Sequence, residues 1–118
     1  MQKNDPELEK SLMEYDNLEK QLQVIVLQKH QLQLQLNEIG LAEEELKKSK
    51  GEIYKSLGVV MVKSNKEDAD KDLRERKELV NMRLGTMAKQ EEKLRSSVMT
   101  LQKKLQDKMK GYGGAGAV

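Results

Sequence analysis

The chain of 118 residues contains no cysteine, tryptophan or phenylalanine, and it has a single proline. Without cysteine, disulfide bonds and thiolate chemistry are excluded. A compact globular core needs large apolar side chains, yet only 3% of the residues are aromatic while 36% are charged. No apolar run approaches the roughly 18 to 20 residues that cross a bilayer, and the first residues contain no apolar signal region. We therefore expect a cytoplasmic protein that has no membrane partner.

The abundant residues are glutamate, lysine, glutamine and leucine, a composition typical of long helices and coiled coils. The formal net charge is only +2, and charges of both signs are interspersed along the chain. A nucleic-acid-binding protein would need a basic stripe or aromatic side chains on which bases stack. The sequence therefore indicates no nucleic-acid partner, and salt-dependent binding to RNA or DNA would reverse that interpretation.

Residues 52–63, near the middle of the chain, are the one stretch with a β pattern. Ile53, Lys55 and Leu57 alternate with Tyr54 and Ser56 before Gly58, and a continuous apolar run follows Gly58, as in a β-hairpin. A single two-stranded hairpin is marginally stable in water and has two unpaired edges. We therefore expect other subunits to complete its sheet, so that the hairpins form the hub of an oligomer. The candidate hub residues are Ile53, Leu57, Val60 and Val62.

A long helical pattern lies on each side of this stretch, over about 6–48 and about 65–109. Asp5 and Pro6 favour the first helix start, and Ser64 and Glu67 have the spacing of a capping box for the second. Apolar residues at heptad spacing predict that the two helices form an antiparallel coiled coil. The first seam comprises Leu8, Ser11, Tyr15, Leu18, Leu22, Ile25, Lys29, Leu32, Leu36, Ile39, Glu43 and Leu46. The second seam comprises Leu73, Lys77, Val80, Leu84, Met87, Glu91, Leu94, Val98, Leu101 and Leu105.

The predicted fold class is therefore mostly α, with one domain over residues 1–110 and a flexible glycine-rich tail over 111–118. Charged residues within the seams fix the predicted register. If the helices fold back at the hairpin, Lys29 faces Glu91 and Glu43 faces Lys77. Opposite charges at seam positions specify register more than they add stability. Gly40 and Gly85 interrupt the helices without an evident reason in the sequence.

The seam weakens near its free end, where Ser11 would lie beside Lys108. We expect the helix tips to separate there and expose apolar surface. Met13, Met99 and Met109 lie off the seam in the same region. They are either incidental surface residues or an adaptable apolar surface, since unbranched thioether side chains accommodate varied partners.

The sequence contains no arrangement that favours catalysis or cofactor binding. Gly111, Gly113 and Gly116 match G-x-G-x-x-G, but the dinucleotide motif needs a strand before it and a helix after it. His30 is the only histidine and falls beside the seam on the outer side. The acidic residues alternate with basic ones along helix faces, and no cluster has metal-ligand spacing. We expect neither enzymatic activity nor a cofactor or metal.

The layout as a whole resembles the prefoldin family, in particular the β-type subunits of archaeal prefoldin. The resemblance extends from about Leu8 to Leu105, and a single hairpin between the helices is like the β type. It is carried by the segments Tyr54-Lys55-Ser56-Leu57-Gly58, Val62-Lys63, Asn65-Lys66-Glu67, Leu27-Gln28-Lys29, Arg83-Leu84 and Lys89-Gln90-Glu91-Glu92-Lys93-Leu94. The glycine-rich tail and the two helical glycines depart from the family pattern.

The resemblance implies an α2β4 hexamer, made with an α-type prefoldin subunit and further copies of this chain. Such assemblies have β-barrel hubs, act as ATP-independent holdases for unfolded polypeptides, and transfer these clients to a group II chaperonin. On this interpretation the tips of the coiled coil hold the client. The candidate client-contacting residues are Leu8, Leu12, Met13, Tyr15, Leu101, Leu105 and Met109.

A structural coiled-coil scaffold or adaptor is the alternative from a different functional class. It predicts saturable binding to one folded partner and no effect on aggregating proteins. The hairpin argues against it, because a spacer between two partners does not need an assembly hub.

Overall fold

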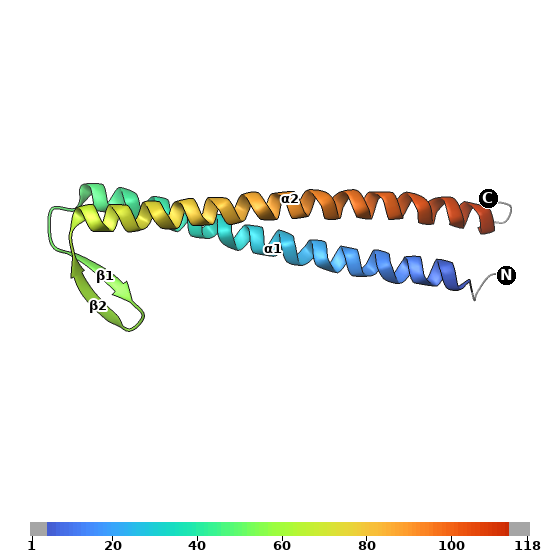
Figure 1. The fold of residues 1–118 in the computed structure, drawn as a ribbon, viewed down its shortest axis with the longest axis horizontal. Helices are drawn as coiled ribbons and strands as arrows, with labels where there is room; N and C mark the ends of the chain where they lie inside the picture. Colours follow the sequence, from blue (N-terminus) through green and yellow to red (C-terminus); the bar gives the residue numbers. More distant parts are fainter. Residues whose placement is uncertain (1–4, 114–118) are drawn as a thin grey trace. The chain divides into compact units, whose positions relative to one another are not determined.

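The computed structural model describes residues 5–113 of the chain. The element order is α1 (Pro6–Lys48), β1 (Ile53–Leu57), β2 (Val60–Ser64) and α2 (Lys66–Gly113), as Figure 1 shows. This order, with one antiparallel sheet of two strands, confirms the predicted pair of long helices joined by a central hairpin.

These elements fall into two compact units, which we describe separately. The arm unit consists of Met1–Gln28 and Met87–Val118, and the hairpin unit consists of Lys29–Thr86. The arm unit therefore combines the first part of α1 with the last part of α2. The hairpin unit holds the rest of both helices together with β1 and β2.

Helix α1 begins where the sequence predicts it. The Asp5 side chain accepts hydrogen bonds from the backbone N–H groups of Glu7 (3.0 Å) and Leu8 (3.1 Å). These contacts satisfy two of the backbone donors that a helix start leaves without a partner. At the other end, the Lys66 ammonium donates to the backbone carbonyls of Lys47 (3.2 Å) and Ser49 (3.1 Å). A cation there complements the negative end of the helix dipole.

Burial follows the predicted heptad seams. Every buried residue of the described chain occupies a seam position, and most neighbouring positions are exposed. In the arm unit the buried residues are Ser11, Leu22, Val98, Leu101 and Leu105. In the hairpin unit they are Leu32, Ile39 and Val80. Each unit is thus held together by a narrow row of side chains rather than by a broad core.

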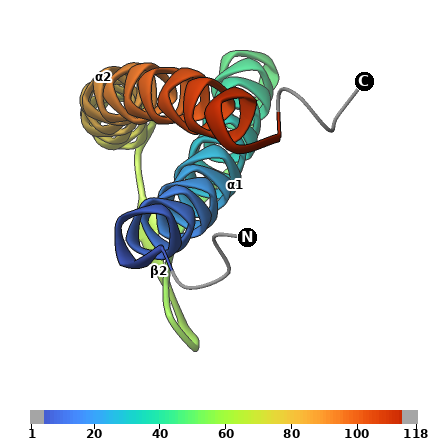
Figure 2. The same ribbon diagram turned by 90° about the vertical axis from the view of Figure 1, so that its right-hand side faces the viewer.

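The hairpin has a two-residue turn, because Leu57 pairs with Val60 across the strands. Gly58 occupies the first turn position with φ 65°, whereas Val59 does not have a positive φ. This is the pattern of a type II′ turn, which requires glycine at its first central position. In the hairpin unit the two strands extend away from the helix ends that they connect (Figures 1 and 2).

Two predicted helix boundaries differ from the structure. The cap of α2 is Asn65 rather than Ser64: its Oδ1 accepts from the Asp68 N–H (2.8 Å) and its Nδ2 donates to the Asp68 carboxylate (3.0 Å). Ser64 still pairs with Ile53 in the sheet, so the helix starts one residue later. Helix α2 also continues to Gly113, because a glycine near a helix end costs only about 1 kcal/mol. The rest of the predicted tail, residues 114–118, lies outside the described residues.

The turn glycine and a helical glycine should respond in opposite directions to the same change. At Gly58 the positive φ strains any side chain, so Gly58→Ala should lower the free energy of unfolding by roughly 1–2 kcal/mol. At Gly85 a Cβ atom would meet nothing within 4 Å, and the residue lies in a helix interior. Gly85→Ala should therefore raise the free energy of unfolding by about 1 kcal/mol. Urea denaturation followed by circular dichroism measures both, and two changes of the same sign would contradict the assigned conformations.

Candidate functional site

The hairpin presents its candidate hub residues on one face. Side chains alternate along a strand and cross-strand partners share a face, so Ile53, Leu57, Val60 and Val62 lie on the same side as Lys55. We call these five residues the Lys55 face. Leu57 and Val60 are both more than half exposed in the single chain, and Ile53 is partly buried. An exposed apolar face on a two-stranded sheet is typical of a surface that another chain covers.

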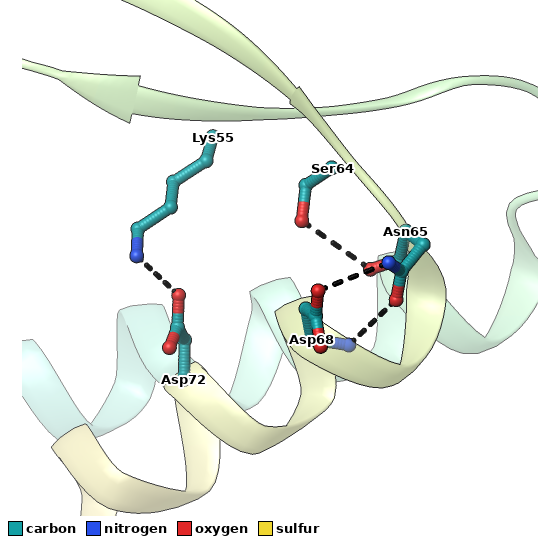
Figure 3. A network of polar contacts seen from close by, with 5 residues as sticks. All are labelled: Lys55, Ser64, Asn65, Asp68 and Asp72. Atoms are coloured by element: carbon teal, nitrogen blue, oxygen red, sulfur yellow. Dashed lines mark hydrogen bonds and ion pairs between the residues drawn. The ribbon is translucent and has the colours of Figure 1, made fainter.

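A polar network fixes the base of this hairpin to α2 (Figure 3). Lys55 reaches from β1 to Asp72 on α2, and the Nζ atom lies 2.5 Å from the carboxylate. The hydrogen bond from Lys55 is the main cause that holds the pKa of Asp72 below its ordinary value. A second ion pair joins Lys63 and Glu52 at 3.6 Å. The Glu52 carboxylate also accepts a hydrogen bond from the Tyr54 hydroxyl, and this bond is the main cause that raises the pKa of Tyr54. Charge pairs thus lie on both faces of the hairpin, and the Lys55–Asp72 pair connects it to α2.

The Lys55–Asp72 pair predicts a pH dependence. Because the pKa of Asp72 is lowered in the folded state, its contribution is fully present above the ordinary value of 3.8 and disappears as the pH falls through the lowered pKa. Asp72→Asn should therefore lower the Tm at pH 7 and have a smaller effect at pH 3. Thermal unfolding at the two pH values measures this difference. A loss that is equal at both values would show that the Asp72 charge does not stabilise the hairpin.

In the arm unit, some of the candidate client-contacting residues are exposed and others are buried. Leu12, Met13 and Met109 are exposed, with Met13 at 74%. Leu8 and Tyr15 are partly buried. Leu101 and Leu105 are only 8% and 7% exposed, so a partner reaches them only if the two helices separate. Met99, which the sequence places off the seam, is 69% exposed and adds to the accessible apolar surface.

The far end of this seam is closed rather than splayed in the described residues. Ser11 is buried there, and the Lys108 ammonium lies 3.2 Å from the Glu7 carboxylate. The Lys108 Nζ atom is shielded from solvent, while the Glu7 side chain is largely exposed. A lysine can lay its aliphatic stem along apolar surface while its charge reaches a carboxylate, and Leu101 and Leu105 stay buried in the same unit. In the same unit the pKa of Tyr15 is raised; burial is the larger cause, and the nearby Glu19 carboxylate is the next.

The register residues lie in both units. In the hairpin unit the Lys77 Nζ atom lies 3.3 Å from Glu43 Oε1, so the structure brings this opposed pair together. Lys29 belongs to the hairpin unit and Glu91 to the arm unit, and their mutual contact stays a prediction. Within the arm unit, Glu91 accepts a hydrogen bond from Arg95 Nε at 2.7 Å.

Sequence reasoning missed two contacts of these surfaces, Lys55–Asp72 and Lys108–Glu7. The first had a signal in the sequence: Lys55 alternates in phase with Ile53 and Leu57, and a charge on an apolar face needs a partner. The second had none, because Glu7 lies off the heptad seam.

Within residues 5–113, no group of three or more His, Asp or Glu side chains is placed to hold a metal ion. In the same range, neither helix has an apolar stretch long enough to span a membrane.

Comparisons with known proteins give a consistent result. A family model described as prefoldin subunit matches residues 9–112. The prefoldin subunit beta of Archaeoglobus fulgidus is 36% identical over 111 residues, which cover 92% of this chain and 96% of the relative. That of Pyrococcus horikoshii is 35% identical and covers 90% of this chain and 92% of the relative. The crystal structure of the prefoldin beta subunit from Thermococcus strain KS-1 superposes with a TM-score of 0.81 at 31% identity, over 91% of this chain and 96% of that one.

Proposed function

Because this chain belongs to the prefoldin subunit family, we propose that it is the β-type subunit of an ATP-independent holdase. In this proposal four copies assemble with two α-type subunits, and the hexamer works in the cytoplasm. It captures unfolded polypeptides and transfers them to a group II chaperonin. The β-type assignment rests on the relatives, which are named prefoldin subunit beta. Membership of the family makes the chain a subunit of a chaperone rather than an enzyme.

The observation that carries the proposal is the exposure of apolar side chains in two distinct units of one small chain. In the hairpin unit they lie on the Lys55 face and at Val59, which is fully exposed at the turn. In the arm unit they include Met13 and Met99. A spacer between two folded partners does not need an assembly hub, whereas a holdase subunit needs one surface for its hub and one for its clients.

The hub follows from the edges of the hairpin. Each strand of a two-stranded sheet has one row of backbone N–H and C=O groups without a strand partner. Strands from neighbouring subunits would pair with these rows, and closure of the extended sheet would enclose Leu57, Val60 and Val62. A closed barrel removes all free edges, which is why it is the arrangement we propose.

The client surface follows from the chemistry of methionine. Its unbranched thioether chain adapts to differently shaped apolar partners, as a holdase for many clients requires. Leu12, Met13 and Met109 make the first contacts because they are exposed in the closed helix pair. Leu8, Tyr15, Leu101 and Leu105 join when the helix ends separate. Several arms acting together supply avidity without one specific pocket.

The proposal is tested by diluting an unfolded test protein into this chain plus an α-type subunit, without ATP, while light scattering is recorded. Suppressed aggregation is expected. Removal of the residues before Leu18 and after Leu101 should abolish this suppression. The truncated chains should still assemble, and the mass of the assembly should fall only by that of the deleted residues. Full suppression by the truncated form would contradict tip capture. No suppression by an intact oligomer would contradict the holdase and favour the scaffold alternative.

A further inference from the structure

A pocket of about 260 Å³ borders one edge of β1 in the hairpin unit. The four consecutive residues 53–56 line it, and none of its lining residues comes from β2. Because consecutive side chains of a strand point to opposite faces, a wall made by all four runs along the strand edge rather than over one face. The other edge of β1 pairs with β2, so the pocket lies beside the edge that has no strand partner in the described chain.

The two helices give this pocket an apolar floor. Leu46 of α1 and Leu73 of α2 line it and are both partly buried. Ala42 and Ala69 line it as well, and their short side chains leave the space between the helices and β1 unfilled. The volume is below the range of about 300–1,000 Å³ that is usual for small-molecule sites, so the pocket suits a side chain of another protein better than a free ligand.

A strand that pairs with the free edge of β1 would pass over the mouth of the pocket. Alternate residues of β1 direct their backbone N–H and C=O groups to that edge. The added strand would lie about 4.8 Å away. Its side chains on the side of Lys55, which reaches Asp72 on α2, would enter the pocket (Figure 3). β1 would thus hold the backbone of the added strand, and the pocket would read one of its side chains.

The lining of the pocket has more positive charge than its one carboxylate neutralises. Its charged residues are Lys55, Asp72 and Arg76. The Lys55 Nζ atom lies 2.5 Å from Asp72, and this hydrogen bond is the main cause of the lowered pKa of Asp72, to which the charge of Arg76 only adds. Asp72 is therefore paired with Lys55, and the guanidinium of Arg76 remains for another carboxylate.

Arg76 differs in this respect from the nearest cations on either side of it. Arg74 pairs with Asp70 at 2.6 Å, and Lys77 pairs with Glu43 at 3.3 Å. Arg76 is exposed, and within residues 5–113 it makes neither a hydrogen bond nor an ion pair. A guanidinium presents its N–H donors in a planar fork that matches a carboxylate. An acidic side chain in the pocket would therefore supply the partner that Arg76 lacks.

A second hollow of the hairpin unit, lined by residues of both strands and of α2, has no such excess of charge. Its lysines and carboxylates are equal in number. They are Lys55, Lys63 and Lys71 on one side and Asp68, Asp72 and Glu75 on the other. Of the two hollows beside the strands, the one at the free edge of β1 is thus the one whose charge calls for an anion.

The strands of this chain have the wrong charge for the pocket. The charged residues of β1 and β2 are Lys55 and Lys63. Glu52 lies directly before β1, but it already accepts the Tyr54 hydroxyl and pairs with Lys63. A second copy on the β1 edge would bring a lysine near Arg76, and like charges on neighbouring strands are unfavourable. The pocket therefore disfavours a second copy and fits a strand of different sequence.

We propose that the pocket beside β1 is a receptor site for an acidic side chain on a strand of a non-identical subunit, with Arg76 as the residue that selects it. This rests on the proposed assembly of the chaperone. It adds to that assembly a particular edge of the hairpin, the chemistry of the partner strand and a specificity residue. The site favours a mixed assembly over one made of this chain alone.

The charge test compares Arg76 with Arg83, an exposed arginine of the same unit that lies outside the pocket. A fluorescently labelled α-type subunit is titrated with the full chain, and association is followed by anisotropy. Arg76→Gln should weaken association about tenfold, because a charge-assisted hydrogen bond is lost. Arg83→Gln should change it less than twofold. Arg76→Glu should weaken association further, and reversal of one hairpin carboxylate of the α-type subunit to lysine should restore at least tenfold of it.

The shape of the pocket has its own matched pair. Ala69→Leu fills the pocket without a change of charge and should weaken association about tenfold. Ala88→Leu, at an exposed position of α2 outside the pocket, should leave it unchanged. Circular dichroism checks that all variants stay helical. Equal effects of the Arg76 and Arg83 variants, or a failure of every carboxylate reversal to rescue Arg76→Glu, would overturn the proposal.

A photo-crosslinker identifies the neighbour at this edge. The chain has no cysteine, so Ser56→Cys provides a single labelling position on β1. A benzophenone there should crosslink to the α-type subunit at least fivefold more than to a second copy, and the reverse ratio would overturn the proposal. If the wild-type assembly suppresses aggregation but the Arg76 variants associate normally, only the pocket assignment fails. If the wild-type chain does not associate with an α-type subunit, the proposed assembly fails together with it.

Discussion

Replacement of Met13, Met99 and Met109 together by serine is expected to weaken capture of an unfolded test protein by roughly 100-fold. The three side chains are 74%, 69% and 60% exposed, so all are available to a client without any opening of the helices. Partial burial of one methionine against a client is worth about 1 kcal/mol, since complete burial is worth about 1.5–3 kcal/mol. Three such contacts amount to about 3 kcal/mol, or two powers of ten in affinity.

The matched control places the same number of serines on the hairpin unit. Leu41, Leu79 and Met82 are 65%, 48% and 71% exposed and lie on helices, but outside the proposed client surface. Their triple replacement should leave capture within about threefold of the wild type. Capture is measured as the concentration that halves aggregation, with the assembled mass checked by multi-angle scattering. If the two triple variants lose capture equally, the client surface is not at the arm methionines.

The sequence was sufficient for the fold because heptad periodicity is a long-range signal that each turn repeats. Burial of Leu22, Leu32, Val80 and Val98 follows directly from it. The hairpin could also be predicted from the sequence, because Gly58 marks the turn and apolar residues flank it. The α2 cap was misplaced by one residue, since both Ser64 and Asn65 are good caps and only the strand pairing of Ser64 decides between them.

The arm end shows what the periodicity alone does not determine. The polar residues Ser11 and Lys108 suggested that the seam opens, but Lys108 reaches Glu7 and the layers beneath stay buried. The Lys108–Glu7 contact depends on the length and flexibility of the lysine side chain, which the heptad pattern does not describe.

Val60→Asp is expected to abolish assembly of the proposed hub, while Met61→Asp leaves the assembly intact. Val60 lies on the Lys55 face, and Met61 points to the opposite face of the same strand. Both are more than half exposed in the single chain, at 54% and 63%, so neither substitution should unfold the chain itself. A carboxylate on the face that other subunits cover would be buried without a partner, which costs several kcal/mol.

A penalty of about 4 kcal/mol at one interface corresponds to roughly a thousandfold weaker association, and each copy in an assembly pays it separately. At micromolar concentration the Val60 variant should therefore sediment as a single chain even with an α-type subunit present, with its helical circular dichroism unchanged. The Met61 variant should sediment with the mass of the wild-type assembly. Assembly by both variants would show that the Lys55 face is not the hub surface. Loss of assembly in both would show that the hub buries both faces of the hairpin, since the strand edges are the same in the two variants.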